Sequence, residues 1–164
     1  MAKTCPATGE PVLYIDCADC EERAECGKKK KTGNSDEFAL LIVGSRTITD
    51  YGFIKRKADI LLSQAAGKYR ITVVSGGAQG VDALAKRYAE EKGYGFVCMP
   101  AEWKKYGKRA GYIRNEAMHG YIAGFEHRGC IMFWDGESKG TMHSIGLAEK
   151  YGNPLRLVRV YSKA

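Results

Sequence analysis

Residues 71–82 read ITVVSGGAQGVD, an apolar run followed at once by a glycine-rich loop. The run from Ile71 to Val74 is typical of a buried strand in a parallel sheet. Apolar residues then recur with helical spacing from Val81 to Ala89, and Gly93 indicates where that helix ends. This strand–loop–helix unit predicts an α/β fold.

The same unit recurs on both sides of this stretch. Apolar runs predict further strands at residues 38–43, 96–99, 130–134 and 155–160, with helical patterns between them. Strands that alternate with helices predict a Rossmann-like, doubly wound, five-stranded parallel sheet over residues 35–164. In such sheets ligands bind beyond the carboxyl ends of the strands, where the strand order reverses. The polar and glycine-rich segments that follow the strands should therefore meet at one edge.

Residues 1–34 have a different composition and are expected to form a separate module that ends in a basic linker. They hold four of the six cysteines, and lysines occupy positions 28–31. The first four cysteines follow the pattern C-x11-C-x2-C-x5-C, which suits a tetrahedral site of four thiolates. We expect structural zinc there, with an iron–sulfur cluster as the alternative. The expected ligands are Cys5, Cys17, Cys20 and Cys26.

The glycine-rich loop after the second predicted strand is expected to bind phosphate or ribose. Closely spaced glycines let backbone amides point at an anion, and the following helix adds its positive end. The loop is neither a Walker loop nor a G-x-G-x-x-G fingerprint. Asp82 either caps the helix or holds the loop or a ribose hydroxyl. The expected ligand-binding residues of this segment are Ser75, Gly76, Gly77, Ala78, Gly80 and Asp82.

Two other strand ends carry comparable segments. After the first predicted strand, a glycine allows close approach, a serine offers a hydroxyl and an arginine can pair with phosphate. After the fourth, a glycine-flanked turn precedes a helix, where Asp135 either binds ribose hydroxyls or caps the turn. The expected ligand-binding residues are Gly44, Ser45, Arg46, Asp135, Gly136, Gly140 and Thr141.

The segment after the third predicted strand contributes an aromatic ring and an arginine beside an apolar helix stripe. Trp103 either stacks on a base or plugs a loop. Arg114 precedes Asn115 on a helix and lies beside that helix's apolar stripe, so its charge needs an anionic partner. That partner is either a structural carboxylate or a ligand phosphate. We expect Trp103, Arg114 and Asn115 to belong to the same site.

As a spaced set, these segments resemble the SLOG superfamily, the Rossmann-like group named after DNA-processing protein A and the plant LOG enzymes. The similarity is greatest to its YspA-type branch. The resemblance covers residues from about 38 to 160 and implies a nucleotide or nucleotide-derived ligand above the glycine-rich loops. The motifs that carry it are GSR at 44–46, SGGAQGVD at 75–82, W-x-x-Y-G at 103–107, AGYIRN at 110–115 and FWDGESKGT at 133–141.

The same resemblance bears on catalysis. LOG enzymes hydrolyse cytokinin nucleotides with an arginine and a glutamate in a G-T-x-x-E motif. Arg114 matches the arginine, but the glutamate position is Ser144 here. A carboxylate that could stabilise an oxocarbenium-like centre or activate water is therefore missing. We expect ligand binding or sensing, with a phosphoribohydrolase as the alternative.

Net charge and composition suggest the class of partner. The formal net charge of +7 lies entirely in residues 35–164, because residues 1–34 hold six basic and six acidic side chains. A basic domain suits a phosphate-bearing ligand or, as a less favoured partner, single-stranded nucleic acid, but the charge alone favours a solvated basic surface. No apolar run is long enough to cross a membrane and no export signal is visible, so a cytoplasmic protein is expected. The sequence is also compatible with a homo-oligomer.

Overall fold

The structure is a computed structural model that describes residues 2–4, 11–13 and 35–161. The chain divides into two compact units, Met1–Thr32 and Gly33–Ala164. In the first unit, β1 (Ala2–Thr4) pairs antiparallel with β2 (Pro11–Leu13). The sequence does not predict this pair, because three residues are too few to show a strand period.

The second unit contains the five predicted strands in one parallel sheet, so the α/β class and the parallel sheet are confirmed. The strand order is β5-β4-β3-β6-β7. The chain therefore begins at the centre, builds outward to one edge, and then returns to build the other half. The strands are β3 (Glu37–Gly44), β4 (Arg70–Ser75), β5 (Gly95–Cys98), β6 (His127–Trp134) and β7 (Leu155–Arg159).

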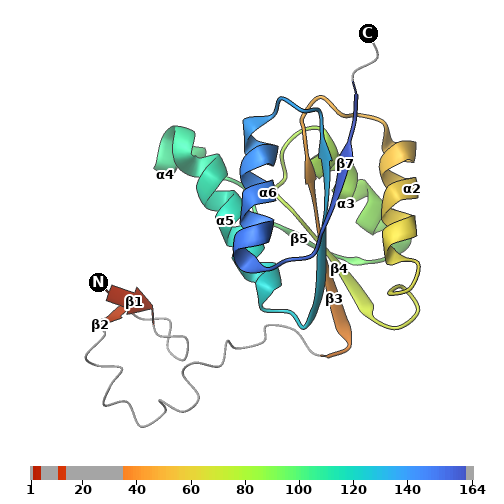
Figure 1. The fold of residues 1–164 in the computed structure, drawn as a ribbon, viewed down its shortest axis with the longest axis horizontal. Helices are drawn as coiled ribbons and strands as arrows, with labels where there is room; N and C mark the ends of the chain where they lie inside the picture. Colours follow the sequence, from red (N-terminus) through yellow and green to blue (C-terminus); the bar gives the residue numbers. More distant parts are fainter. Residues whose placement is uncertain (1, 5–10, 14–34, 162–164) are drawn as a thin grey trace. The chain divides into compact units, whose positions relative to one another are not determined.

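Helices cover both faces of this sheet (Figure 1). α2 (Tyr51–Leu62) and α3 (Val81–Lys92) lie on one face. α5 (Ala110–Ala123) and α6 (Lys139–Tyr151) lie on the other. A short helix, α4 (Trp103–Tyr106), and a 3-10 turn, η1 (Gly107–Arg109), lead into α5. None of the described helices is long and apolar enough to cross a membrane.

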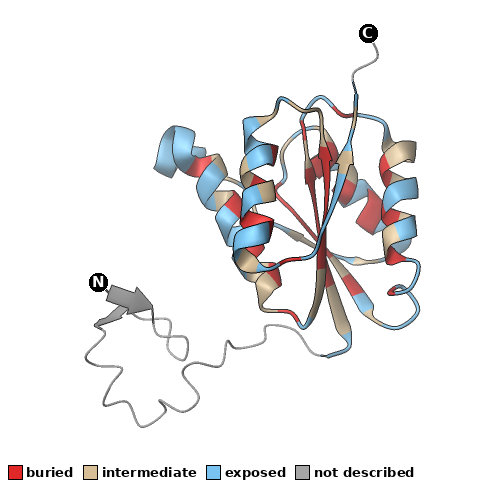
Figure 2. Cartoon of the chain, viewed as in Figure 1, coloured by how far each residue is buried: buried red, intermediate tan, exposed pale blue. Residues whose placement is uncertain are grey.

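The central strand β3 explains why its sequence is a continuous apolar run. Leu40 and Ile42 pack with α2 and α3, whereas Ala39, Leu41 and Val43 pack with α5 and α6. All five side chains are buried, as the red centre of the sheet shows (Figure 2). A strand covered on both faces has no position for a polar side chain. The core therefore lies in two layers, one on each side of β3.

Helix ends follow the capping residues in the sequence. The Asp50 side chain accepts a hydrogen bond from the backbone nitrogen of Phe53 at 3.0 Å and so begins α2. Gly93 and Gly152 end α3 and α6 in the left-handed conformation, with φ of 70° and 65°. Asp50 lies at the carboxyl edge of the sheet, where α2 begins, whereas Gly93 and Gly152 lie at the opposite edge, where the chain enters β5 and β7.

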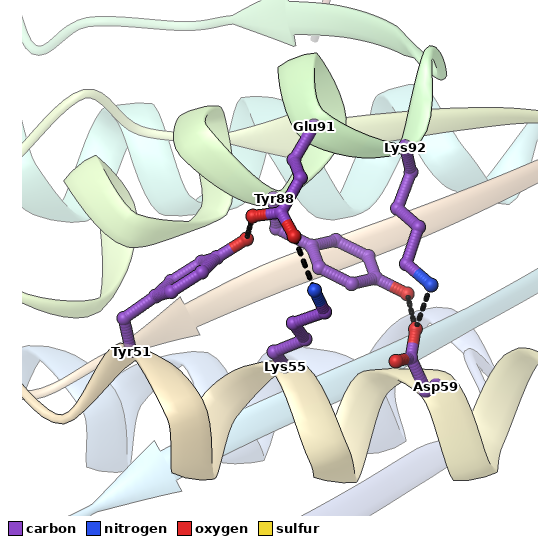
Figure 3. Close-up of polar contacts among 6 residues, drawn as sticks. All are labelled: Tyr51, Lys55, Asp59, Tyr88, Glu91 and Lys92. Carbon is purple, nitrogen blue, oxygen red and sulfur yellow. Dashed lines mark hydrogen bonds and ion pairs between the residues drawn. The ribbon is translucent and has the colours of Figure 1, made fainter.

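Polar contacts between α2 and α3 hold α3 in place behind the glycine-rich loop (Figure 3). Asp59 accepts hydrogen bonds from the Tyr88 hydroxyl at 2.8 Å and from Lys92 Nζ at 2.9 Å. One turn away, Glu91 accepts from Tyr51 and Lys55. Burial and the Glu91 carboxylate raise the pKa of Tyr51 to about 12, so its phenol stays protonated and donates.

Candidate functional site

A cavity of about 380 Å³ opens at the carboxyl edge of the sheet. Its lining comes from the segments that follow β3, β4, β5 and β6, so the predicted convergence of these segments occurs. The central strand β3 contacts β4 on one side and β6 on the other, which is where the chain reverses direction. The predicted site residues that line the cavity are Gly44, Arg46, Ala78, Asp82, Trp103, Arg114, Asn115, Asp135, Gly140 and Thr141.

Six predicted site residues lie outside this lining, and two of them are buried serines whose side chains link neighbouring strands or loops. Ser75 donates from Oγ to the carbonyl of Ile42 at 2.8 Å, linking β4 to β3. Ser45 accepts at Oγ from the backbone nitrogen of Asp135 at 3.1 Å, linking the loops after β3 and β6. The other four are Gly76, Gly77, Gly80 and Gly136.

The glycines of the loop after β4 make room for protein neighbours. A Cβ at Gly76 would lie 2.3 Å from Arg114 Nη1, and a Cβ at Gly80 would lie 2.6 Å from the carbonyl oxygen of Arg46. Gly80 also has a φ of 75°, which disfavours any other residue. Close packing between strand-end segments therefore requires these glycines. This packing role says nothing about whether the backbone amides of the glycines also bind a ligand.

Asp82 in the first turn of α3 organises the same loop. Its Oδ2 accepts a hydrogen bond from the backbone nitrogen of Ala78 at 3.2 Å. The side chain is buried, and Oδ1 has no hydrogen-bond partner among the described residues. Burial raises the pKa of the carboxyl group, although Arg114 and nearby backbone amides oppose this effect. Oδ1 is therefore a buried acceptor that no described residue satisfies, which is energetically costly.

Arg114 lies between the glycine-rich loop and the start of α6. Its Nη1 donates to the carbonyl of Gly76 at 2.7 Å, and its Nε donates to Asn115 Oδ1 at 3.0 Å. Asn115 in turn donates from Nδ2 to the carbonyl of Gly140 at 3.2 Å. Burial lowers the pKa of the guanidinium, while Asp82 opposes the change. The ion pairs between described residues do not include Arg114, so its charge is only partly compensated.

The turn that precedes α6 is held by its own side chains. Asp135 Oδ1 accepts from the backbone nitrogens of Glu137 and Ser138 at 2.9 and 2.8 Å, and Oδ2 accepts from the Thr47 hydroxyl at 3.0 Å. Those amides lower the pKa of Asp135. Ser138 then caps α6 by accepting from the Thr141 nitrogen at 3.4 Å. Of its two predicted roles, Asp135 here performs the capping of the turn.

Aromatic and cationic side chains form the rim of the cavity. Trp103 is 50% exposed and Tyr112 is 45% exposed, and the Tyr112 ring packs edge to face with His143 at 4.7 Å between centroids. Trp103 also packs over Gly111, where an added Cβ would lie 3.4 Å from the ring. Lys108 adds a third positive side chain to the lining, besides Arg46 and Arg114. The rim therefore combines aromatic rings with positive charge.

Several residues of the lining are not among the ligand-binding residues that the sequence predicts. Lys108 and Tyr112 lie inside the segment that carries Trp103 and Arg114, so its aromatic and basic content was the available signal. Ser144 was recognised only as the residue at the glutamate position of the LOG motif. The full set of such residues is Val43, Thr47, Lys108, Gly111, Tyr112, Ser138 and Ser144.

The predicted zinc ligands lie outside the described residues. These are Cys5, Cys17, Cys20 and Cys26. Within residues 2–4, 11–13 and 35–161, no group of three or more metal-ligating side chains comes together. Cys130 is buried on β6, where burial raises the pKa of its thiol to about 12. Cys98 is exposed at the end of β5.

Comparison with known proteins identifies the family. The model of the family described as "YspA, cpYpsA-related SLOG family" matches residues 38–106. The Gene 61 protein of Mycobacterium phage D29 is 36% identical over 122 residues, which make up 71% of this chain and 92% of that protein. This chain belongs to the YspA, cpYpsA-related SLOG family. Membership of the SLOG family indicates nucleotide-related binding or processing.

A solved structure is similar to this SLOG chain at lower identity. It is the X-ray structure of DNA processing protein A (DprA) from Streptococcus pneumoniae, with 20% identity and a TM-score of 0.48. The match covers 74% of this chain and 49% of that protein, so the chain spans about half of the length of DprA.

Proposed function

We propose that the cavity at the carboxyl edge of the sheet binds a nucleotide or a nucleotide-derived ligand. The observation that carries this proposal is the convergence of the four strand-end segments on one cavity lined by Arg46, Lys108 and Arg114. Ligands of doubly wound sheets bind at this edge, near the reversal of strand order. A cavity of about 380 Å³ is within the usual range for small-molecule sites.

The lining offers a suitable partner for each part of a nucleotide. The guanidinium of Arg114 and the start of α6 can hold a phosphate, because both carry positive charge. The free acceptor Oδ1 of Asp82 can receive a ribose hydroxyl. The half-exposed ring of Trp103 at the rim can stack on a base.

We expect the protein to bind nucleoside monophosphates without releasing the base. Ser144 cannot act as a carboxylate, and both oxygens of Asp135 already accept hydrogen bonds within the turn. Calorimetry with a panel of nucleoside 5′-monophosphates, followed by chromatography for free base, is the test. Binding without base is the expected result. Rapid base release that depends on Arg114 would instead support the phosphoribohydrolase.

Single-stranded nucleic acid is the second candidate ligand, and one surface favours it. Residues 103–112 carry Trp103, Tyr106 and Tyr112, each more than a third exposed, among four basic side chains. Exposed rings with flanking cations are typical of single-strand binding. The salt dependence of affinity separates the two ligands, because a strand that contacts several cations loses affinity steeply as salt rises. A shallow slope favours the small nucleotide.

We further propose that Cys5, Cys17, Cys20 and Cys26 hold one structural zinc ion. Four thiolates at this spacing fit tetrahedral zinc, and Cys5 directly follows β1 in the sequence. Elemental analysis should find about one zinc per chain. The variant Cys20→Ser should lose the metal, whereas Cys98→Ser, a control at an exposed cysteine, should keep it. Disulfides or free thiols at all four positions, without a metal, would contradict the proposal.

A further inference from the structure

A chain of four polar side chains, three of them buried, runs from β6 to the cavity. It connects Arg128 on β6, Asn153 after α6, His119 on α5 and Ser144 on α6. His119 is completely buried, whereas Ser144 contributes to the lining of the cavity. The direction of each hydrogen bond in this chain follows from the one before it.

Arg128 fixes the orientation of the Asn153 amide. A guanidinium only donates hydrogen bonds. Its Nε lies 2.7 Å from Asn153 Oδ1, and its Nη1 donates to the carbonyl of Phe125 at 2.9 Å. Asn153 therefore presents its oxygen to Arg128, and its Nδ2 faces His119.

Asn153 in turn selects the tautomer of His119. Its Nδ2 lies 3.2 Å from His119 Nδ1 and 3.2 Å from the carbonyl of His119. An amide nitrogen can only donate, so Nδ1 must be unprotonated. Burial and His143 lower the pKa of His119 to about 4, so that the ring is neutral at physiological pH. A neutral ring with a bare Nδ1 carries its proton on Nε2.

The protonated Nε2 of His119 then donates to Ser144. The two atoms lie 2.8 Å apart. Ser144 Oγ accepts this hydrogen bond through one of its lone pairs. Among the described residues, the Ser144 side chain makes no other hydrogen bond. The contact with His119 therefore does not use the hydroxyl hydrogen of Ser144. His119 is thus a donor to Ser144, the opposite of the arrangement that activates a serine nucleophile.

We propose that Ser144 is a ligand-contacting hydrogen-bond donor, with its hydroxyl aimed into the cavity by the chain Arg128–Asn153–His119. This inference rests on the proposed function, because it assigns one contact of the same site. The acceptor is an oxygen of the ligand. A phosphate oxygen suits best, since Thr141 and the first turn of α6 lie directly beside Ser144 on the same helix. Arg128, Asn153 and His119 are positioning residues.

The first experiment reads the tautomer without any ligand. Long-range proton–nitrogen spectra of ¹⁵N-histidine-labelled protein at alkaline pH should show His119 protonated at Nε2. The signal is assigned by its loss in His119→Gln. In Asn153→Asp the new carboxylate only accepts, so the proton should move to Nδ1. Ser144 must then donate to Nε2 and turn its hydrogen away from the cavity.

The second experiment measures binding of adenosine 5′-monophosphate (AMP) and of inorganic phosphate at the same pH. Ser144→Ala should weaken AMP binding about five- to tenfold, the effect of one hydrogen bond. Asn153→Asp should weaken it by a similar factor, and the double variant should be no weaker than either single variant. His119→Gln, whose amide can still donate to Ser144, should bind AMP nearly as well as the wild type.

Two results would overturn the role assigned to Ser144 but leave the proposed function of the cavity intact. One is a wild-type His119 protonated at Nδ1, and the other is a Ser144→Ala variant that binds AMP as tightly as the wild type. The wild-type tautomer decides the first point even if Asn153→Asp fails to fold. Failure of the wild type to bind any nucleoside monophosphate or phosphate would instead overturn the proposed function, and the Ser144 contact with it.

Discussion

Replacing Arg114 by alanine should weaken AMP binding about tenfold to hundredfold, the range expected for a charge-assisted contact with phosphate. The structure gives two reasons for an effect this large. The guanidinium holds the carbonyl of Gly76 and, through Asn115, the start of α6, so it also shapes the cavity. Its charge is only partly compensated by Asp82, which leaves it available to an anion.

Two further variants make the Arg114 experiment specific. Arg114→Lys keeps the charge but cannot make both of the arginine's hydrogen bonds, so its affinity should lie between those of the wild type and Arg114→Ala. Arg109→Ala removes an exposed arginine on η1 outside the cavity lining and should bind AMP like the wild type. Equal loss in Arg109→Ala and Arg114→Ala would mean that net charge, rather than this contact, governs binding.

Acid should destabilise the wild type more than the His119→Gln variant, by about 3 kcal/mol at about pH 4. Burial lowers the pKa of His119 from 6.5 to about 4 in the folded protein. Between these two values the unfolded chain binds a proton that the folded protein does not. The free energy of unfolding therefore falls as the pH drops through this range, and the contribution is complete above about pH 6.5.

Urea unfolding at about pH 7 and about pH 4 measures this difference. The other ionisable groups are the same in both proteins, so most of their contribution cancels when the two pH dependences are subtracted. An NMR titration of His119 provides a second reading that does not require the variant to be stable. A His119 that titrates near 6.5, or equal losses of stability in the two proteins, would contradict the buried neutral imidazole.

Most of the fold follows from local sequence patterns. The apolar run at residues 38–43 is continuous because helices cover both faces of β3. A continuous apolar run of this kind indicates a central strand of a parallel sheet. Asp50, Gly93 and Gly152 mark helix ends because capping depends on a single residue. The pair β1–β2 shows no such pattern.

The candidate site was predictable only in outline. Strand-end position brought the four segments together, since the carboxyl ends of parallel strands share one edge. The sequence does not show why glycine is needed at positions 76 and 80, because Gly76 and Gly80 make room for residues that are distant in the sequence. The contact between His119 and Ser144 joins residues 25 positions apart on two helices, and no local spacing signals it.

A crystal structure of the protein with AMP shows directly whether the cavity at the carboxyl edge of the sheet binds a nucleotide. We expect the phosphate beside Arg114 and the start of α6, a ribose hydroxyl near Asp82, and the base against Trp103. Nucleotide density on a remote surface, with the cavity at the carboxyl edge of the sheet filled only by solvent, would contradict the proposed function.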